Sequence, residues 1–305
     1  MCPSSGSLFE PAILDSLEGL LRALELKPAG PDRFQVAAEP GQFTDRIFGG
    51  QLLAQALIAA NATVAADMAP YSLHASFVEA GAPQHPVELV VDRVRDGRSS
   101  ATRQVTLLQD GRPRLVATAG FRSASESFDS PAPGESPVAD GVEPEKLPLI
   151  QQWAEQAPAD RSERSRSWID RPPAVEIRMA EPTTFLGGPP AQGKRPHWMR
   201  LPRDIGDDPA LHAAMLAYAS DFFLMDIVFR AYPDPAAVGR LGGFSLDHVL
   251  WLHRPARFDR WHVHTQEALT VAEDRGLARG LIHDIDGNLV ATVMQDVLVR
   301  RLEAP

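Results

Sequence analysis

The sequence predicts an α+β fold in which an antiparallel sheet curls around a buried helix, and it predicts this unit twice. Each half of the 305-residue chain has one long apolar helical segment: residues 49–66, and a segment from about Asp208-Pro209 to residue 230. The first is apolar on nearly every side, which is typical of a buried helix. Strand patterns follow each helix. They lie at 71–79, 86–95, 99–109 and 113–122 in the first half, and at 244–253, 261–272, 276–284 and 288–301 in the second.

The two halves share short motifs in the same order, which indicates an internal duplication. Residues 115–118, Leu-Val-Ala-Thr, recur as residues 289–292. Each copy follows an Asp-Gly pair, Asp110-Gly111 or Asp286-Gly287, which is typical of a hairpin turn. Two copies of one helix-and-sheet unit in a single chain predict a pseudo-dimer.

A polar segment separates the halves. Residues 123–148 are rich in Pro, Ser and Glu, and such a composition buries too little apolar surface to offset its ordering entropy. We expect a linker or a connection draped over the surface, followed by a short exposed helix within residues 160–173. The predicted organisation is a first unit at 1–122, a connection at 123–171 and a second unit at 172–305.

Composition limits the partners. The chain has 30 basic and 40 acidic residues and a formal net charge of −10. Proteins that bind nucleic acid usually carry a basic surface, so nucleic acid is not an expected partner. A single cysteine, Cys2, excludes an intrachain disulfide and agrees with a reducing compartment. No run reaches the about 18 apolar residues of a membrane helix, and the N-terminal residues lack a signal-peptide pattern. We expect a cytoplasmic protein without a membrane partner.

One polar side chain interrupts an aliphatic strand face. Along residues 288–301 alternate side chains share a face, and Gln295 is the polar member of an otherwise aliphatic set. A buried amide without a partner costs about 1–3 kcal/mol, so Gln295 should have one. The matching residue of the first half is Phe121. A structural hydrogen bond and a role in a site both explain Gln295.

Asp221 is predicted in the middle of the second apolar helix. Its helical neighbours are apolar or aromatic, so its pKa should rise unless donors surround the carboxylate. Alternatively, Ser220-Asp221 caps a new helix after a break. Ser245 begins a strand, a position where serine is usually structural. Strand alternation places Ser245 and Asp247 on one face and His248 on the other.

Other chemistries have less support. The sequence lacks a G-x-S-x-G elbow, a G-x-G-x-x-G motif and a P-loop. His262 and His264 share a strand face, but no further metal-ligand cluster accompanies them, so we expect no metal. Several arginines surround the Asp96-Gly97 turn, either as a solvated face or as contacts for nucleotide phosphates. They are Arg93, Arg95, Arg98 and Arg103.

Six ordered blocks are more specific than any single motif. They are Arg46-Ile-Phe-Gly-Gly-Gln-Leu-Leu-Ala-Gln-Ala-Leu57, Leu73-His-Ala-Ser-Phe77, Arg95-Asp-Gly-Arg-Ser99 with Arg103, Leu216-Ala-Tyr-Ala-Ser-Asp221, Phe244-Ser-Leu-Asp-His-Val-Leu-Trp-Leu-His-Arg-Pro255 and Arg275-Gly-Leu-Ala-Arg-Gly280. These blocks resemble the acyl-CoA thioesterase II (TesB-like) family, whose members have a double-hotdog fold. The resemblance covers both halves and skips mainly the linker.

The resemblance implies hydrolysis of an acyl-CoA substrate by an activated water, with no cofactor and no metal. It carries three catalytic residues onto this chain. The Asp of the Tyr-x-Ser-Asp segment is Asp221, the general base; the hydroxyl residue of the Ser/Thr-x-Asp-His segment is Ser245; and the Gln near the end of the last strand is Gln295. Ser245 and Gln295 would hold the water. Backbone N–H groups at a helix N-terminus would bind the oxyanion, with Gly49-Gly50 as a candidate.

The sequence departs from the family pattern at two places. Asp296-Val297 replaces the usual Glu-Gly after the glutamine, and Glu79-Ala80-Gly81 replaces Arg-Pro-Gly. These departures permit a divergent specificity or a weakened enzyme, and they are the only support for the alternative of a non-catalytic protein that binds acyl-CoA or lipid. A third alternative is an enzyme that acts on a non-CoA thioester, such as that of an acyl-carrier protein. A homo-oligomer is also expected, because sheet edges or faces can associate.

Overall fold

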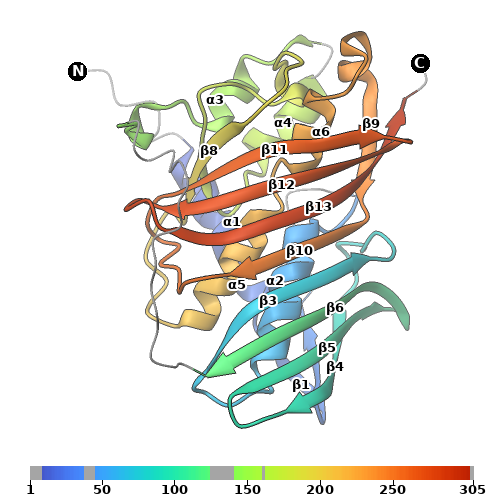
Figure 1. The fold of residues 1–305 in the computed structure, drawn as a ribbon, viewed down its shortest axis with the longest axis vertical. Coiled ribbons are helices and arrows are strands. Elements are labelled where there is room, and N and C mark those ends of the chain that lie inside the picture. The colour runs from blue at the N-terminus through green and yellow to red at the C-terminus, as the bar shows by residue number, and fades with distance from the viewer. Residues whose placement is uncertain (1–8, 38–44, 124–140, 160–161, 303–305) are drawn as a thin grey trace.

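The computed structural model describes residues 9–37, 45–123, 141–159 and 162–302. Within them the strands form one 13-stranded antiparallel sheet (Figure 1). The first half contributes β1 (Lys27–Gly30), β2 (Arg33–Val36), β3 (Met68–Phe77), β4 (Val87–Asp96), β5 (Ser100–Gln109) and β6 (Arg112–Ser123). The second half contributes β7 (Glu176–Arg178), β8 (Arg195–Arg200), β9 (Leu241–Ser245), β10 (Asp247–Leu252), β11 (His262–Ala272), β12 (Arg275–Asp284) and β13 (Leu289–Arg301).

The sheet consists of two repeats joined edge to edge. The strand order is β1-β2-β4-β5-β6-β3 in the first half and β10-β13-β12-β11-β8-β7 in the second, and β9 pairs with β13. Strands β3 and β10 pair antiparallel across the junction, with Leu73 opposite Leu250. The backbone ladder therefore continues from one half into the other, which confirms the predicted double-hotdog fold.

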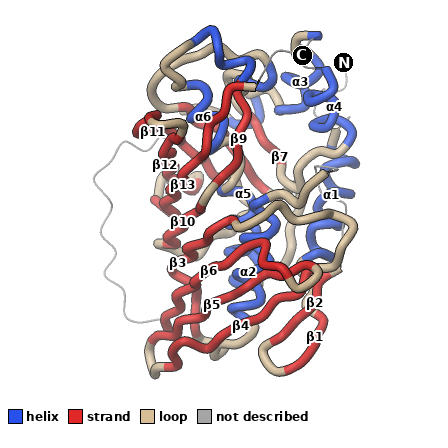
Figure 2. The backbone as a smooth tube through the Cα atoms, turned by 90° about the vertical axis from the view of Figure 1, so that its right-hand side faces the viewer, coloured by secondary structure: helices blue, strands red, loops and turns tan. Residues whose placement is uncertain are grey.

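Two apolar helices cover one face of this sheet and contact each other: α2 (Gly49–Asn61) and α5 (Pro209–Ser220). Asp208 caps α5 by accepting a hydrogen bond from the Ala210 N–H at 2.9 Å. A side view shows the sheet as one layer and the helices as a second (Figure 2). The remaining helices are α1 (Glu10–Ala23), α3 (Ile150–Glu155), α4 (Ser162–Asp170) and α6 (Leu224–Arg230), with 3₁₀ turns η3 (Pro144–Lys146), η5 (Thr184–Leu186) and η6 (Pro235–Arg240).

The duplication is visible in the strand register. Phe121 in β6 pairs with Ala101 in β5, and the matching Gln295 in β13 pairs with Ala278 in β12. The hairpin before β6 turns at Asp110-Gly111, whose φ angles of 51° and 73° lie in the left-handed region that this turn requires. The predicted strands and hairpins are therefore confirmed to within a few residues, apart from a break in the predicted strand 244–253.

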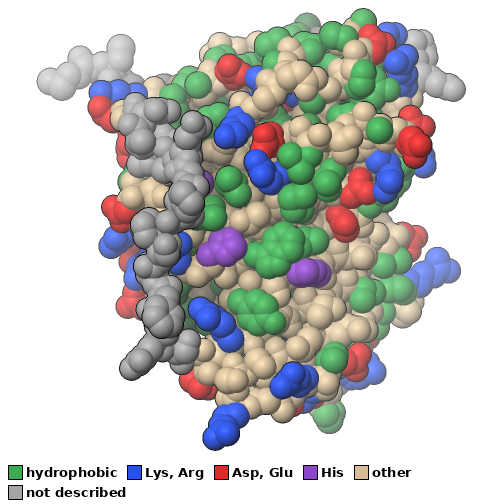
Figure 3. Space-filling view, viewed as in Figure 1, with side chains coloured by type: hydrophobic (Ala, Val, Ile, Leu, Met, Phe, Trp, Pro, Cys, Tyr) green, Lys and Arg blue, Asp and Glu red, His purple; other side chains and the backbone are tan. Residues whose placement is uncertain are grey.

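The outer face of the sheet is open to view in Figure 3. Acidic and basic side chains are dispersed around its edges, whereas hydrophobic and histidine side chains gather near the middle, over the junction of β3 and β10. The rings of His74 and Trp251 meet edge to face across this junction, 5.4 Å apart. This contact adds to the backbone ladder that joins the halves.

Three predicted boundaries were wrong. The first apolar helix ends at Asn61 rather than residue 66, where Thr63 Oγ1 donates to the Ala60 carbonyl at 2.8 Å. The second breaks after Ser220 and resumes as α6. The predicted strand at 244–253 is split into β9 and β10 by Leu246. The last two breaks shape the site.

The connection between the halves differs partly from its prediction. Residues 124–140, which make up most of the predicted linker, lie outside the described residues. The predicted exposed helix corresponds to α4, but its Trp168 is buried and stacks on Phe223. The division at residues 122 and 171 stays a prediction. One described segment, Pro209–Arg230, is long and apolar enough to span a membrane, but 83% of its apolar window is buried inside the protein.

Candidate active site

A break between α5 and α6 places Asp221 at a helix end. Of the two sequence expectations, the mid-helix position was wrong and the break is confirmed, although Asp221 ends α5 and does not cap the next helix. Asp221 is the C-cap of α5, and Phe223 adopts a left-handed φ of 67° that stops the helix. The last carbonyl groups of a helix need partners. Gln266 Nε2, from β11, donates to the Phe222 carbonyl at 2.7 Å and so stabilises the break.

The Asp221 carboxylate lies against the N-terminus of α2, where the Gly50 N–H donates to it. Two glycines permit this approach. A Cβ on Gly49 would lie 2.7 Å from Asp221 Oδ2, and a Cβ on Gly50 would lie 2.2 Å from the Tyr218 carbonyl oxygen. The unpaired N–H groups and dipole of a helix N-terminus favour a negative charge. The first half therefore supplies a docking position for a carboxylate from the second.

Burial controls the protonation of this carboxylate. Asp221 is only 9% exposed. Burial raises the pKa of Asp221 to about 7, although hydrogen bonds from the Gly50 N–H and from Gln295 oppose the rise. The same carboxylate adds to the burial effect that raises the pKa of Tyr218, one turn back along α5. Asp221 thus changes charge near neutral pH.

Gln295 and Ser245 complete the cluster. Gln295 lies on the buried face of β13, as predicted, and its Nε2 donates to Ser245 Oγ at 2.5 Å. Ser245 ends β9, which pairs with β13 so that Ser245 lies opposite Val297. The structure therefore brings together the three residues that the resemblance named. Their catalytic roles stay predictions.

A fourth residue of the cluster, His248, was assigned to the opposite face from Ser245. That prediction was wrong because Leu246 interrupts the strand: its N–H donates to the Asp296 carbonyl at 2.8 Å and its carbonyl accepts from Phe77 at 3.0 Å. Alternation restarts after Leu246, and the fully buried His248 ring faces the cluster. Its Nδ1 lies 2.7 Å from Gln295 Oε1 and 3.7 Å from Asp221 Oδ1.

The acidic side chains of the two departures from the family pattern, Asp296 and Glu79, point away from this cluster. Asp296 lies on the opposite face of β13 from Gln295 and pairs with Arg275 at 2.7 Å. Glu79 is exposed and pairs with Arg114. Neither acidic side chain bonds to Asp221 or Gln295. Val297, the other residue of the first departure, is buried and lies opposite Ser245, so this departure reaches the edge of the cluster.

The arginines near the Asp96-Gly97 turn do not form one solvated group. Arg103 is fully buried; it donates to Thr63 Oγ1 at 2.8 Å and pairs with Asp96. Arg93 pairs with Asp32 at 2.8 Å. These contacts tie β4 and β5 to neighbouring turns and favour a structural role for both residues.

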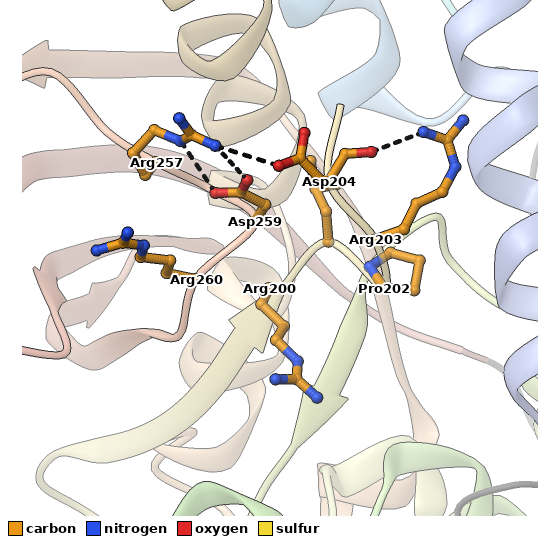
Figure 4. Close-up of a pocket in the computed structure, with 8 residues that line it drawn as sticks. Arg200, Pro202, Arg203, Asp204, Arg257, Asp259 and Arg260 are labelled. Atoms are coloured by element: carbon orange, nitrogen blue, oxygen red, sulfur yellow. Dashed lines mark hydrogen bonds and ion pairs between the residues drawn. The ribbon is translucent and has the colours of Figure 1, made fainter. Parts of the chain in front are cut away.

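A second group of arginines lines a surface hollow near the N-terminal end of α5 (Figure 4). Arg257 reaches Asp259 at 2.7 Å and Asp204 at 3.5 Å, and Arg203 pairs with Glu18. The hollow is thus largely a network of ion pairs between loops and α1. Arg257 also pairs with Asp207, just before α5 begins, whereas Asp221 caps the other end of that helix.

No group of three or more His, Cys, Asp or Glu side chains in the described ranges is arranged to hold an ion. His262 and His264 share a buried face of β11, as expected, and burial lowers the pKa of both. They are neutral interior histidines.

Comparison with known proteins gives consistent matches along the chain. The family model described as acyl-CoA thioesterase N-terminal domain matches residues 38–122, and that of the acyl-CoA thioesterase C-terminal domain matches residues 144–299. Acyl-coenzyme A thioesterase 8 of Mus musculus is 30% identical over 91% of this chain and 87% of its own. Acyl-CoA thioesterase 2 of Haemophilus influenzae is 27% identical over 94% and 98%.

Solved structures agree. A crystal structure of an acyl-CoA thioesterase II, TesB2, from Mycobacterium marinum superposes with a TM-score of 0.70 at 28% identity, over 93% of this chain and 98% of that one. A tesB protein from Mycobacterium avium subspecies paratuberculosis also gives 0.70, at 29% identity, over 93% and 99%. With family models matched in both halves and a fold shared along nearly its whole length, this chain belongs to the acyl-CoA thioesterase family.

Proposed function

We propose that the protein hydrolyses acyl-CoA thioesters to a free acid and CoA, and that Asp221, Ser245 and Gln295 activate the attacking water. Family membership supports the reaction. One observation carries the assignment of residues: a buried carboxylate with a pKa of about 7 that is hydrogen-bonded to Gln295, which also bonds a serine hydroxyl.

Asp221 is the general base. A base works best when its pKa lies near the working pH, because it is then both ionised and basic enough to accept a proton. With a pKa of about 7, Asp221 is largely ionised just above neutral pH and is a stronger base than an ordinary aspartate. The Gly50 N–H, at the N-terminus of α2, holds the carboxylate in place.

Ser245 orients the water rather than attacking the thioester itself. Its described partner is the Gln295 amide, which cannot accept the hydroxyl proton as a base would. Because Ser245 Oγ accepts a hydrogen bond from Gln295, its own proton is available to a water held between Ser245 and Asp221. Such positioning supplies several kcal/mol of a barrier, on the order of a thousandfold in rate.

The bond changes balance without a cofactor. The water oxygen bonds to the thioester carbon while Asp221 takes one of its protons; the C–S bond then breaks and releases CoA as a thiolate. Asp221 gives its proton to the thiolate or to solvent and is ready for the next turnover. A thiolate is a weak base, so it leaves without a strong general acid. The Gly50 N–H, which the sequence suggested for the oxyanion, is instead engaged by Asp221.

The test is thiol release from acyl-CoAs of short to long chain and from an acyl-carrier-protein thioester, with the wild type and Asp221→Asn side by side. We expect wild-type turnover on part of the panel, and a loss of about 10²–10⁴-fold in the variant. Circular dichroism and the melting temperature check that the variant is folded. Full activity in Asp221→Asn would exclude Asp221 as the base. Binding of acyl-CoA without turnover by the wild type would indicate a non-catalytic protein, and turnover confined to carrier-protein thioesters would move the substrate class.

A further inference from the structure

His248 is a buried titratable side chain that the proposed mechanism does not use, although it contacts the site directly. Its ring lies between two groups: Nδ1 is 2.7 Å from Gln295 Oε1, and Nε2 is 2.9 Å from Ser220 Oγ. Burial lowers the pKa of His248 to about 4, although its hydrogen bond to Gln295 opposes this. The ring is therefore neutral at neutral pH, with one nitrogen as donor and the other as acceptor.

The orientation of the Gln295 amide decides which nitrogen carries the proton. An ionised carboxylate only accepts hydrogen bonds, so the amide must present its NH₂ group to Asp221. The same NH₂ group reaches Ser245 Oγ at 2.5 Å. The amide oxygen then faces His248, and this oxygen needs a donor. The proton of the neutral ring is therefore on Nδ1.

Ser220 decides between the two forms of the ring. With the proton on Nδ1, Nε2 is an acceptor and accepts a hydrogen bond from the Ser220 hydroxyl. Ser220 Oγ also lies 2.8 Å from the Ala217 carbonyl, which competes for the same proton. If the Ser220 hydroxyl donated to that carbonyl instead, Nε2 would carry the ring proton and donate to Ser220 Oγ. Nδ1 would then present a lone pair to Gln295. The amide would then rotate and turn its oxygen toward Asp221.

We propose that His248 is a positioning residue, whose Nδ1–H holds the Gln295 amide with its NH₂ group toward Asp221 and Ser245, and that Ser220 keeps the ring in this form. The chain of donors runs from Ser220 to His248, to Gln295, and on to Ser245 and Asp221. Both ends of this chain of hydrogen bonds lie at the C-terminus of α5, because Ser220 and Asp221 are consecutive. This inference rests on the proposed catalytic role of Asp221 and Gln295.

The groups around Asp221 and His248 affect the protonation of both side chains. Asp221 is faced by the Gly50 N–H from α2, by Gln295 from β13, by His248 from β10 and by Tyr218 from its own helix. His248 is also near His264 of β11, a second interior histidine that burial keeps neutral. Among these described neighbours, the acidic group that titrates near neutral pH is Asp221.

Two substitutions at one position separate a hydrogen bond from simple packing. The Asn side chain places a nitrogen two bonds from Cβ, where His carries Nδ1, so His248→Asn keeps the donor to Gln295. His248→Leu fills much of the volume but removes the donor. Ser220→Ala leaves the ring in place but removes the hydroxyl that bonds to Nε2, so the ring is held less firmly. His262→Leu is the matched control, because it removes another buried histidine whose Nδ1 bonds to a backbone carbonyl, that of Arg260, at 2.9 Å.

The main readout is the pH profile of kcat/KM. The Gln295 bond holds the pKa of Asp221 down, so its loss raises that pKa. We expect His248→Leu to lower kcat by about tenfold and to move the acid limb of the profile up by about half a pH unit or more. We expect Ser220→Ala to shift the limb in the same direction by less. His248→Asn should restore the wild-type limb, and His262→Leu should not move it.

A second readout does not depend on catalysis. Two-bond ¹H–¹⁵N correlation spectra distinguish the two neutral forms of histidine, and the His248 signals are assigned by their loss in His248→Asn. We expect an Nδ1–H form in the wild type. An Nε2–H form, or equal acid limbs in wild type and His248→Leu, would overturn the inference. If the Nδ1–H form is present but Asp221→Asn retains full activity, the hydrogen-bond chain stands and the proposed catalytic set fails.

Discussion

The two halves of the molecule have the same strand pairing, but a matching buried position holds an aromatic side chain in the first half and a polar side chain in the second. Phe121 and Gln295 occupy the same place in their repeats, each beside an alanine of the preceding strand. Both are buried, yet one packs as an aromatic ring and the other bonds to Ser245. The first repeat has kept an apolar interior here, whereas the second has replaced it with a hydrogen-bonded cluster.

The helices differ in a complementary way. Helix α2 has no acidic residue and begins with Gly49-Gly50, whereas α5 ends in Asp221. The site needs both, because the positive end of the first helix stabilises the carboxylate that ends the second. A duplicated fold thus permits specialisation: one repeat supplies a helix terminus and an apolar core, and the other supplies the hydrogen-bonded polar side chains.

The strongest test of this difference is to exchange the types of side chain at the two matching positions. Phe121→Gln places an amide on an apolar face that has no Ser245 or His248 counterpart. We expect a loss of about 3–5 kcal/mol in the free energy of unfolding, from lost packing and an unpaired amide. Urea denaturation measures it, and kcat per folded molecule should change little. A loss below about 1 kcal/mol would mean that the first half tolerates a polar core as well as the second.

The reverse exchange should affect rate more than stability. Gln295→Leu removes the amide that bonds Ser245 and Asp221 but keeps an apolar side chain of similar size. We expect kcat/KM to fall about a hundredfold, which corresponds to about 2.7 kcal/mol, with a small change in melting temperature. Steady-state kinetics and thermal denaturation on the same sample measure both. An unchanged rate with a large loss of stability would assign Gln295 a structural role only.

A smaller effect is expected where the helices meet. A Cβ at Gly50 would lie 2.2 Å from the Tyr218 carbonyl oxygen, so Gly50→Ala must move α2 away from α5. The Gly50 N–H would then reach Asp221 less well. We expect kcat to fall about 30-fold, because small displacements of a catalytic group are costly. Thiol-release assays measure the fall. Wild-type kcat in a folded Gly50→Ala variant would show that the carboxylate does not depend on this contact.

The sequence predicted most of the sheet because its strands have regular alternation and Asp-Gly turns, and both signals are local. It missed the left-handed Phe223, because no Gly or Pro marks the break in that aromatic run; the break depends on Gln266 from a distant strand. It placed His248 on the wrong face, because one residue, Leu246, resets the alternation. A family resemblance identified the residues of the site. Their close approach depends on the left-handed Phe223 and on the interruption at Leu246.

The last prediction concerns the cost of keeping Asp221 buried. Its pKa is about 7 in the folded protein against an ordinary 3.8, so between these values the folded state binds more protons than the unfolded state. Stability therefore falls as pH rises through this window and stays lower above it. Between about pH 6 and pH 8.5 the Asp221 contribution alone should fall by about 1.4 kcal/mol.

Buried neutral histidines act in the opposite direction as pH rises, because their folded pKa values are lowered. They are present in the wild type and in Asp221→Asn alike, so the difference between the two unfolding curves isolates Asp221. We expect urea denaturation at both pH values to show a loss of stability in the wild type, relative to the variant, as pH increases. Equal changes would mean that Asp221 is already ionised below about pH 6 and is a weaker base than its burial implies.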